Sequence, residues 1–373
     1  MTVPLSVTRS QALAFRLDRQ HLLAPAPDAL AAARTLVGAQ AQVHSAAILQ
    51  LRARSPDATE ASIRAALFEE RRLLKMWGQR GTLHLVASDD VDLILAVRQT
   101  VVESYRRWGM NEGLTAEQVD ALAAAIPEAM ANGPVSRNDL ASALVPRLGE
   151  WARPWLEHSW GGAIKLAAAL GYVCHGPERD REATFLRLDH WIPLAEFDAA
   201  RCRAELLRRY LTAFGPAGPR DFAKFTGLPA AAVHAAFDAL RPELLPVAVE
   251  GKPAWALAAD REALAAAEMP PGEITVLPLF DPFLLAHADT TDIVPARHRS
   301  LVYRTAGWIS AVILREGRLV AVWTHRRRGT AWDVAVTPLA RFGRQPLRRA
   351  LRRLNHMAAA VGVNEISIRV EAG

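Results

Sequence analysis

One arrangement recurs three times along this chain: a set of helical segments is followed by two short apolar strands with a glycine-containing turn between them. In the first copy the apolar spacing predicts helices over 7–19, 28–37, 45–54 and 59–70, then strands over 73–77 and 82–86. Gly78-Gln79-Arg80-Gly81 forms the turn between these strands. Helices followed by a hairpin are typical of a winged helix-turn-helix.

Two later stretches repeat the arrangement. The second copy predicts helices over 116–131, 137–147 and 155–170, strands over 171–175 and 183–188, and a polar tip over 176–182. The third predicts helices over 198–213, 221–226 and 230–240, and strands over 244–250 and 254–259. A single winged helix can serve as a protein-interaction module, but three in one chain favour a scaffold for nucleic acid.

The C-terminal part changes character at about residue 274. Strands are expected from there to 336, with a meander over 308–314, 319–324 and 330–336, and a final helix over 345–360. We therefore predict an α+β fold with four segments: winged helix 1 at 1–114, winged helix 2 at 115–195, winged helix 3 at 196–268 and a β-rich element at 269–373.

Basic charge is concentrated in that C-terminal part. The chain carries a net charge of +6, whereas residues 297–353 hold 14 arginines against Glu316 and Asp333, a net of +12. The rest of the chain must then carry 6 − 12 = −6. Such a distribution is the footprint of a polyanion-binding surface.

Two groups of arginines stand out in this basic region. Arg326, Arg327 and Arg328 follow His325 at the predicted tip of a hairpin, where they repel one another unless a phosphate backbone neutralises them. On the final helix the outward positions are arginines, which form either a solvated face or a second DNA contact: Arg348, Arg349, Arg352 and Arg353.

Other features limit the class of protein. Cys174 and Cys202 have no CxxC spacing and no paired histidine cluster, so neither a disulfide framework nor a zinc site is expected, and no cofactor is predicted. The N-terminus shows no signal peptide, and no apolar run approaches the ~18 residues that span a bilayer. We expect a cytoplasmic protein, associated with the nucleoid, that does not bind a membrane.

Two amides, Gln40 and Gln42, stand behind Gly38 in otherwise aliphatic sequence. Gly38 interrupts a helical run, and in an extended segment residues i and i+2 point to the same face, so we expect the two amides to lie side by side. Taken alone, the pair is more often a helix cap and a solvated side chain. Whether this pair of amides is functional therefore depends on the motifs in the rest of the chain.

Several motifs, taken together, resemble the AlkZ-like winged-helix DNA glycosylases. The motifs that carry the resemblance cover nearly the whole chain in order: Gly38-Ala39-Gln40-Ala41-Gln42, Arg80-Gly81-Thr82-Leu83-His84-Leu85-Val86, Gly215-Pro216, Asp221-Phe222-Ala223, Thr226-Gly227-Leu228, Leu277-Pro278-Leu279-Phe280-Asp281-Pro282 and the hairpin from Gly317 to Trp323. The resemblance implies three tandem winged helices around a concave basic channel, and a hairpin that probes DNA. It implies excision of bulky N-alkylated purines, including interstrand crosslinks, in repair or in self-resistance to a genotoxic natural product.

The resemblance assigns catalysis to Gln40 and Gln42, and double-stranded DNA as the partner of a monomeric, monofunctional glycosylase. An amide cannot take up a proton at neutral pH, so neither glutamine can be a general base. Both can hold a water beneath C1′ and stabilise a developing oxocarbenium ion. That help suffices where the purine is alkylated at N3 or N7, because a cationic base departs without protonation.

Alternatives remain for several residues. Arg80 and His84 of the first hairpin are candidate DNA contacts. His84, on the same strand face as Thr82, either reaches the site or is a buried histidine bonded to the backbone, and Trp77 and Trp323 are either stacking platforms or core aromatics. At the level of function, a DNA-binding regulator would keep the wings and arginines but need no paired amides. A protein-interaction scaffold would show no salt-dependent affinity for DNA.

Overall fold

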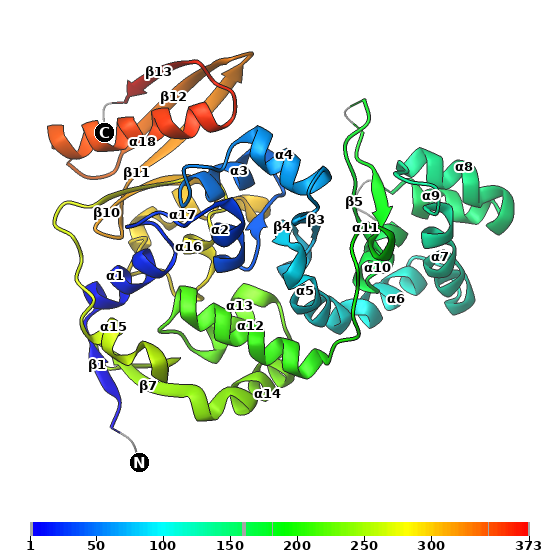
Figure 1. Cartoon of the computed structure of the whole chain (residues 1–373), viewed down its shortest axis with the longest axis horizontal. Helices are drawn as coiled ribbons and strands as arrows, with labels where there is room; N and C mark the ends of the chain where they lie inside the picture. The colour runs from blue at the N-terminus through cyan, green and yellow to red at the C-terminus, as the bar shows by residue number, and fades with distance from the viewer. Residues whose placement is uncertain (1–2, 159–161, 181, 342, 372–373) are drawn as a thin grey trace. The chain divides into compact units, whose positions relative to one another are not determined.

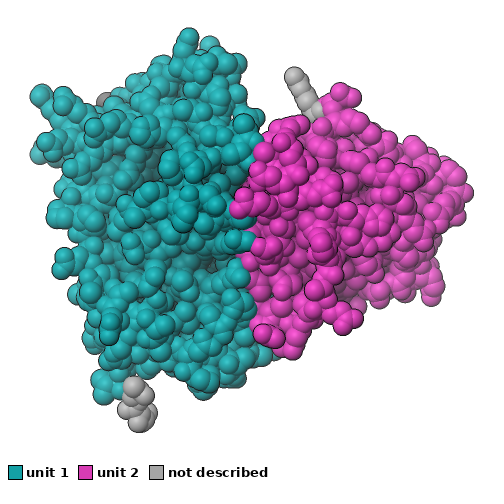
Figure 2. Space-filling model, in the orientation of Figure 1, with its two compact units in different colours: residues 1–63, 204–373 teal, residues 64–203 magenta. Residues whose placement is uncertain are grey.

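The structure is a computed structural model that describes residues 3–158, 162–180, 182–341 and 343–371. Its elements are labelled in Figure 1. The chain forms two compact units (Figure 2): unit 1 comprises residues 1–63 and 204–373, and unit 2 comprises residues 64–203. The mixture of helices and strands confirms the predicted α+β class. The four predicted segments do not coincide with these units and stay a prediction.

Unit 1 begins and ends the chain. Its N-terminal elements are β1 (Leu5–Val7), α1 (Arg9–Arg19), α2 (Ala29–Thr35), β2 (Ala39–Gln40) and α3 (His44–Arg52), and α4 (Glu60–Phe68) crosses into unit 2. The chain returns through α12 (Ala199–Phe214) to α13 (Pro219–Thr226), α14 (Ala230–Leu240), β7 (Leu244–Val249), β8 (Lys252–Leu257) and α15 (Arg261–Ala265). The remaining elements are β9 (Ile274–Leu277), α16 (Pro282–Leu285), α17 (Arg299–Val302), β10 (Ala311–Arg315), β11 (Arg318–Arg328), β12 (Ala331–Pro338), α18 (Arg344–Ala360) and β13 (Glu365–Val370).

The smaller sheet of unit 1 has the order β1-β7-β8. The predicted hairpin of β7 and β8 is present, and β1 adds to it in parallel, with Leu5 opposite Val247. Apolar side chains from these strands pack with Phe15 of α1 and Leu264 of α15. The N-terminus of the chain therefore completes the third hairpin, a pairing that the sequence did not predict.

The larger sheet has the order β13-β12-β11-β10-β9, in which only β12 and β13 run parallel. The predicted meander is thus present, with the unpredicted β13 added beside β12. Helix α18 packs on β9, β13 and α3 (Figure 1). Side chains of β9 and β10 share a core with Leu13 and Leu17 of α1. Trp323 is 1% exposed and its indole donates to the Leu277 carbonyl at 3.0 Å, so it is a core residue.

Unit 2 contains the first two predicted hairpins. Its strands are β3 (Leu73–Trp77), β4 (Leu83–Ala87), β5 (Val173–His175) and β6 (Phe185–Arg187), and they pair in the order β4-β3-β5-β6. Its helices are α5 (Val91–Arg98), α6 (Val102–Asn111), α7 (Ala116–Ala129), α8 (Arg137–Leu148), α9 (Arg153–Leu156), α10 (Gly162–Ala169) and α11 (Leu188–Trp191). Trp77 stacks against Phe185, with ring centroids 6.1 Å apart, and belongs to the core with Ile126 and Leu140.

The single helix predicted over 155–170 is wrong. Helix α9 ends at Leu156, the next two residues are not helical, and α10 begins at Gly162. Residues 159–161 of that prediction, and residue 181 of the predicted tip over 176–182, lie outside the described residues. In the described part of the chain, no helix combines the length and apolar character that crossing a membrane requires.

Candidate functional site

The turn after α2 delivers Gln40 to its place. Asp28 caps the helix by accepting the Ala31 N–H at 2.7 Å. At the other end the Gly38 N–H donates to the Ala33 carbonyl at 2.9 Å, with a φ of 101° that favours glycine. Gly38 therefore ends the helical stretch, as predicted, and the chain continues into the short strand β2.

The two candidate catalytic amides lie in different environments. Gln40 is 7% exposed and ends β2, whereas Gln42 is exposed and lies between β2 and α3. The extended segment expected to carry both is thus limited to Ala39–Gln40. Gln40 therefore projects from the end of a strand, and Gln42 from the connection that follows it.

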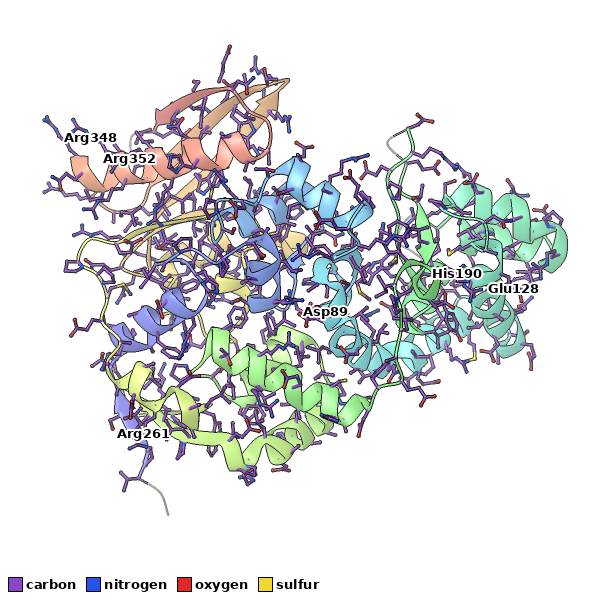
Figure 3. All side chains as sticks on the ribbon, in the orientation of Figure 1. Asp89, Glu128, His190, Arg261, Arg348 and Arg352 are labelled. Atoms are coloured by element: carbon purple, nitrogen blue, oxygen red, sulfur yellow. The ribbon has the colours of Figure 1, made fainter. Side chains whose placement is uncertain are left out.

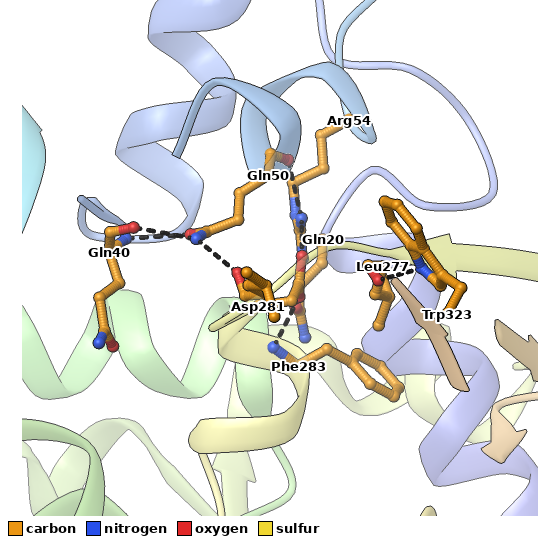
Figure 4. A network of polar contacts seen from close by, with 9 residues as sticks. Gln20, Gln40, Gln50, Arg54, Leu277, Asp281, Phe283 and Trp323 are labelled. Carbon is orange, nitrogen blue, oxygen red and sulfur yellow. Dashed lines mark hydrogen bonds and ion pairs between the residues drawn. The ribbon is translucent and has the colours of Figure 1, made fainter. Parts of the chain in front are cut away.

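The main chain of Gln40 is held by the side chain of Gln50. The Gln40 N–H donates to Gln50 Oε1 at 3.0 Å, and Gln50 Nε2 donates back to the Gln40 carbonyl at 3.0 Å. Figure 4 shows this pair of contacts, with the side chain of Gln40 extending away from them. These two hydrogen bonds satisfy the backbone N–H and carbonyl of Gln40 and fix the backbone from which its side chain projects.

Gln50 belongs to a larger buried polar network. The Nε2 of Gln50 also donates to the Leu279 carbonyl at 3.2 Å, and the backbone carbonyl of Gln50 accepts from Arg54 Nη1 at 2.9 Å. Arg54 forms a bidentate pair with Asp281 at 2.8 and 2.9 Å, and both side chains are fully buried. Asp281 also accepts the Phe283 N–H at 3.0 Å and so caps α16. Because its charges are paired and bonded, this network ties α3 to the segment after β9.

The basic hairpin differs from the prediction at its tip. Arg326, Arg327 and Arg328 belong to strand β11, and the turn is formed by Gly329 and Thr330. All three arginines are exposed. The pairing of β11 with β12 continues to Arg328 opposite Ala331, so the ladder extends further than the sequence pattern suggested.

One of these arginines has an acidic neighbour that is close in space but not adjacent in the sequence. Arg328 Nε lies 3.2 Å from the carboxylate of Asp333 on the adjacent strand. His325 is half-buried and stacks on Trp332, with ring centroids 4.1 Å apart. The end of the hairpin therefore carries exposed arginines next to the stacked rings of His325 and Trp332.

The arginines of α18 divide into two kinds. Arg348 and Arg352 are exposed, and Figure 3 shows them projecting from the helix. Arg349 donates to the Gly272 carbonyl at 3.0 Å, and Arg353 pairs with Glu273 at 2.7 Å. The latter two therefore also fasten α18 to the segment before β9.

Arg80 and His84 belong to the first hairpin, in unit 2. Arg80 is half-buried with a φ of 56°, and burial lowers its pKa to about 10. His84 is 3% exposed, and its Nδ1–H donates to the Thr82 carbonyl at 2.9 Å. Burial, reinforced by the charge of Arg80, lowers the pKa of His84 to about 3, so its imidazole is neutral at pH 7. This geometry favours the structural alternative for His84.

Comparison with known proteins identifies the family. The family model described as DNA glycosylase AlkZ-like matches residues 33–360. The chain belongs to the AlkZ-like DNA glycosylase family. An interstrand DNA cross-link repair glycosylase of Streptomyces sahachiroi is 31% identical over 377 residues, covering 96% of this chain and 98% of that protein. The solved structure of the Streptomyces sahachiroi DNA glycosylase AlkZ superposes with a TM-score of 0.87 at 29% identity, covering 98% of this chain and 100% of that one.

Within this AlkZ-like chain, the sequence pattern pointed to Gln40 but not to the residues that hold it. Gln50 and Arg54 are one helical turn apart near the C-terminal end of α3, among buried apolar residues. Two polar residues with that spacing on an apolar helix indicate a buried network. Their partner Asp281 belongs to a motif already singled out for the resemblance.

Proposed function

We propose that this AlkZ-like protein is a monofunctional DNA glycosylase that removes bulky purines alkylated at N3 or N7, including those in interstrand crosslinks. Gln40 and Gln42 position the water that attacks C1′. The observation that carries this proposal is the pair of hydrogen bonds from Gln50 that fixes the Gln40 backbone, in a chain matched by the glycosylase family over residues 33–360.

The chemistry requires little from the protein beyond positioning. As the bond from C1′ to the purine nitrogen breaks, its electron pair neutralises the positive charge of the alkylated ring. Water adds to C1′ and releases a proton to solvent. Carbonyl oxygens of Gln40 and Gln42 orient this water and stabilise the cationic sugar. Neither glutamine has to exchange a proton.

Contacts to the phosphate backbone come from the basic region of unit 1. We propose that Arg326, Arg327 and Arg328, with Arg348 and Arg352, neutralise phosphates of duplex DNA, since all five are exposed. The three sets of helices and hairpins act as tandem winged helices that line the DNA-binding channel, and one chain suffices for the whole reaction. His84 has a structural role in the first hairpin, where it is buried and bonded to the Thr82 carbonyl.

The test is single-turnover incubation of the protein with a duplex that carries one N7-alkylguanine. Release of the free base, with an abasic site in the strand, is expected from the wild-type protein and not from heat-treated protein. Duplex binding without release of any base would contradict the proposal and favour the non-catalytic regulator.

A further inference from the structure

A cavity of about 230 Å³ opens in unit 1, apart from Gln40 and from the exposed arginines of the hairpin. Its wall is built by the loop after α1, the C-terminal end of α3, β9 and the C-terminal half of α18. Five basic side chains line it: His21, Arg52, Arg54, Arg353 and His356. Among the described residues, no acidic side chain lines it.

The five basic groups are not equally available. Arg54 is committed to Asp281, and Arg353 is paired with Glu273. Arg52 donates only its Nε to the His356 carbonyl, at 3.2 Å, and takes part in no ion pair formed among the described residues. Arg52 therefore brings a positive charge and its terminal nitrogens to a cavity whose lining holds no carboxylate, although the carboxylate of Asp57, outside the lining, is near enough to act on that charge.

His21 is held at the cavity in an unusual backbone conformation. Its φ is 58°, in the left-handed region that residues other than glycine rarely adopt. Burial, and then the charge of Arg54, lower the pKa of its imidazole. This conformation ends α1, where the Leu22 N–H donates to the Leu17 carbonyl at 2.9 Å, and it leaves His21 in the lining of the cavity.

The chemistry of the lining defines the class of ligand. Guanidinium and imidazole groups converge from three separate elements, and apolar side chains, among them Leu22, Val276 and Met357, complete the wall. A doubly charged oxyanion would gain charge-assisted hydrogen bonds from Arg52, and the space exceeds what one phosphate group fills. We propose that this cavity is a phosphate-binding site, recognised through Arg52, His21 and His356. It accepts either a phosphate of DNA or the phosphate of a free nucleotide.

The first experiment uses inorganic phosphate and the full-length protein, by isothermal titration calorimetry at constant ionic strength. We expect one saturable site with a Kd of about 1 mM or lower, and about tenfold weaker binding to Arg52→Gln. The matched control is Arg261→Gln, which removes an exposed arginine outside the cavity and should bind as wild type does. Absence of saturable binding, or equal affinity of wild type and Arg52→Gln, would overturn the proposal.

A second variant separates binding from folding. His21→Gly removes the imidazole at a backbone conformation that glycine adopts without strain, so the protein should melt at the same or a higher temperature. We expect it nonetheless to bind phosphate more weakly by about fivefold to tenfold. Wild-type affinity in this variant would contradict the assigned role of His21.

Competition distinguishes the two sources of the phosphate. If DNA supplies it, inorganic phosphate should displace a short undamaged duplex from wild type more than chloride of equal ionic strength does, and not from Arg52→Gln. If a free nucleotide supplies it, AMP should bind more tightly than inorganic phosphate and leave duplex affinity unchanged. Both results support the site. Neither measurement involves base excision, so they stand apart from the proposed glycosylase activity.

Discussion

The side chain of Gln50 determines where the backbone of Gln40 lies, which makes it a positioning residue for the proposed reaction. In Gln50→Glu the carboxylate can still accept the Gln40 N–H. It can no longer donate to the carbonyls of Gln40 and Leu279. We expect single-turnover excision to slow by about 10- to 100-fold and duplex affinity to change little, since the substitution weakens preorganisation away from the DNA-binding arginines.

The matched control for that change is Gln99→Glu, which makes the same chemical substitution at an exposed position of unit 2. It should leave the excision rate unaltered. If Gln50→Glu only lowered the melting temperature and kept the wild-type rate, Gln50 would be a structural residue without influence on the chemistry.

Substitutions of Gln40 and Gln42 test the chemistry directly. Gln→Ala at either position should slow excision of an N7- or N3-alkylated purine by about 10- to 1000-fold, equivalent to about 1.4–4 kcal/mol. Duplex binding should barely change, because neither residue carries charge, and Gln42→Asp should keep part of the activity. Equal single-turnover rates for wild type and the double alanine variant would mean that the catalytic site lies elsewhere in the chain.

At the scale of elements, the hairpin of β11 and β12 carries three consecutive exposed arginines. Replacing Arg326, Arg327 and Arg328 by Ala should weaken duplex binding. It should also lower the salt dependence of affinity by ~0.9 in log–log slope for each phosphate that the variant no longer neutralises. The measurement is a fluorescence titration at several salt concentrations. An unchanged slope would show that the hairpin does not contact phosphate.

Asp333→Asn gives the complementary test of the same hairpin. It removes the carboxylate 3.2 Å from Arg328 Nε and keeps the shape of the side chain. If Arg328 contacts a phosphate, this variant should bind duplex more tightly and with a steeper salt dependence than wild type. The two variants therefore shift affinity in opposite directions.

Strand β5 of unit 2 contains a buried histidine that links stability to pH. His175 packs against the rings of Trp77 and Phe185, with ring centroids 4.8 and 4.9 Å away, and burial, then Lys75 and Arg137, lower its pKa to about 3. In the unfolded chain the same group takes up a proton near pH 6.5. Stability is therefore lost as the pH falls from about 6.5 towards 3, by about 1.4 kcal/mol per pH unit from this residue.

We expect His175→Phe to reduce the loss of stability between pH 6 and pH 4, since phenylalanine suits the aromatic surroundings and binds no proton. Urea unfolding at pH 4, 5 and 6 measures this slope, with the exposed His190→Phe as the matched control. His84, in the same unit, has a similarly lowered pKa, so part of the acid sensitivity should remain. Identical slopes for wild type and His175→Phe would contradict this account of His175.

For the whole molecule, the sequence predicted helices and strands best where the pattern of apolar residues within the segment is sufficient to indicate them. Helix α14 occupies the predicted range 230–240 because its apolar face repeats with helical period after Pro229, and β3 occupies the predicted range 73–77. It failed where partners are distant. Strand β1 forms by pairing with β7, about 240 residues away, and β13 forms in parallel with β12. Strand β1 has only three residues, too few to show an alternation, whereas the six residues of β13 do alternate between polar and apolar and could have indicated a strand.

The candidate site shows the same division. Gly38 and Gln40 were evident from the pattern, and so was the charge of the hairpin. The hydrogen bonds of the Gln50 side chain to Gln40 and Leu279 require α3 to lie close to β2 and to the segment after β9. No local sequence pattern predicts that arrangement. Likewise, the ion pair of Arg328 with Asp333 follows from the register of β11 on β12, which extends past the expected tip.

Substrate choice by the whole molecule rests on the charge of the leaving base. Because Gln40 and Gln42 cannot protonate a purine, the proposed mechanism works only on a base that departs as a neutral molecule. A duplex with 7-methyl-7-deazaguanine has nearly the same shape as one with 7-methylguanine but lacks the positive ring, so its base must leave as an anion. We expect both duplexes to bind with similar affinity and the neutral one to be cut at least ~1000-fold more slowly, the order of help that a general acid gives. Single-turnover release of the two bases from matched duplexes measures this ratio. Comparable rates would require a proton donor in the site, and the glutamine mechanism would then be wrong.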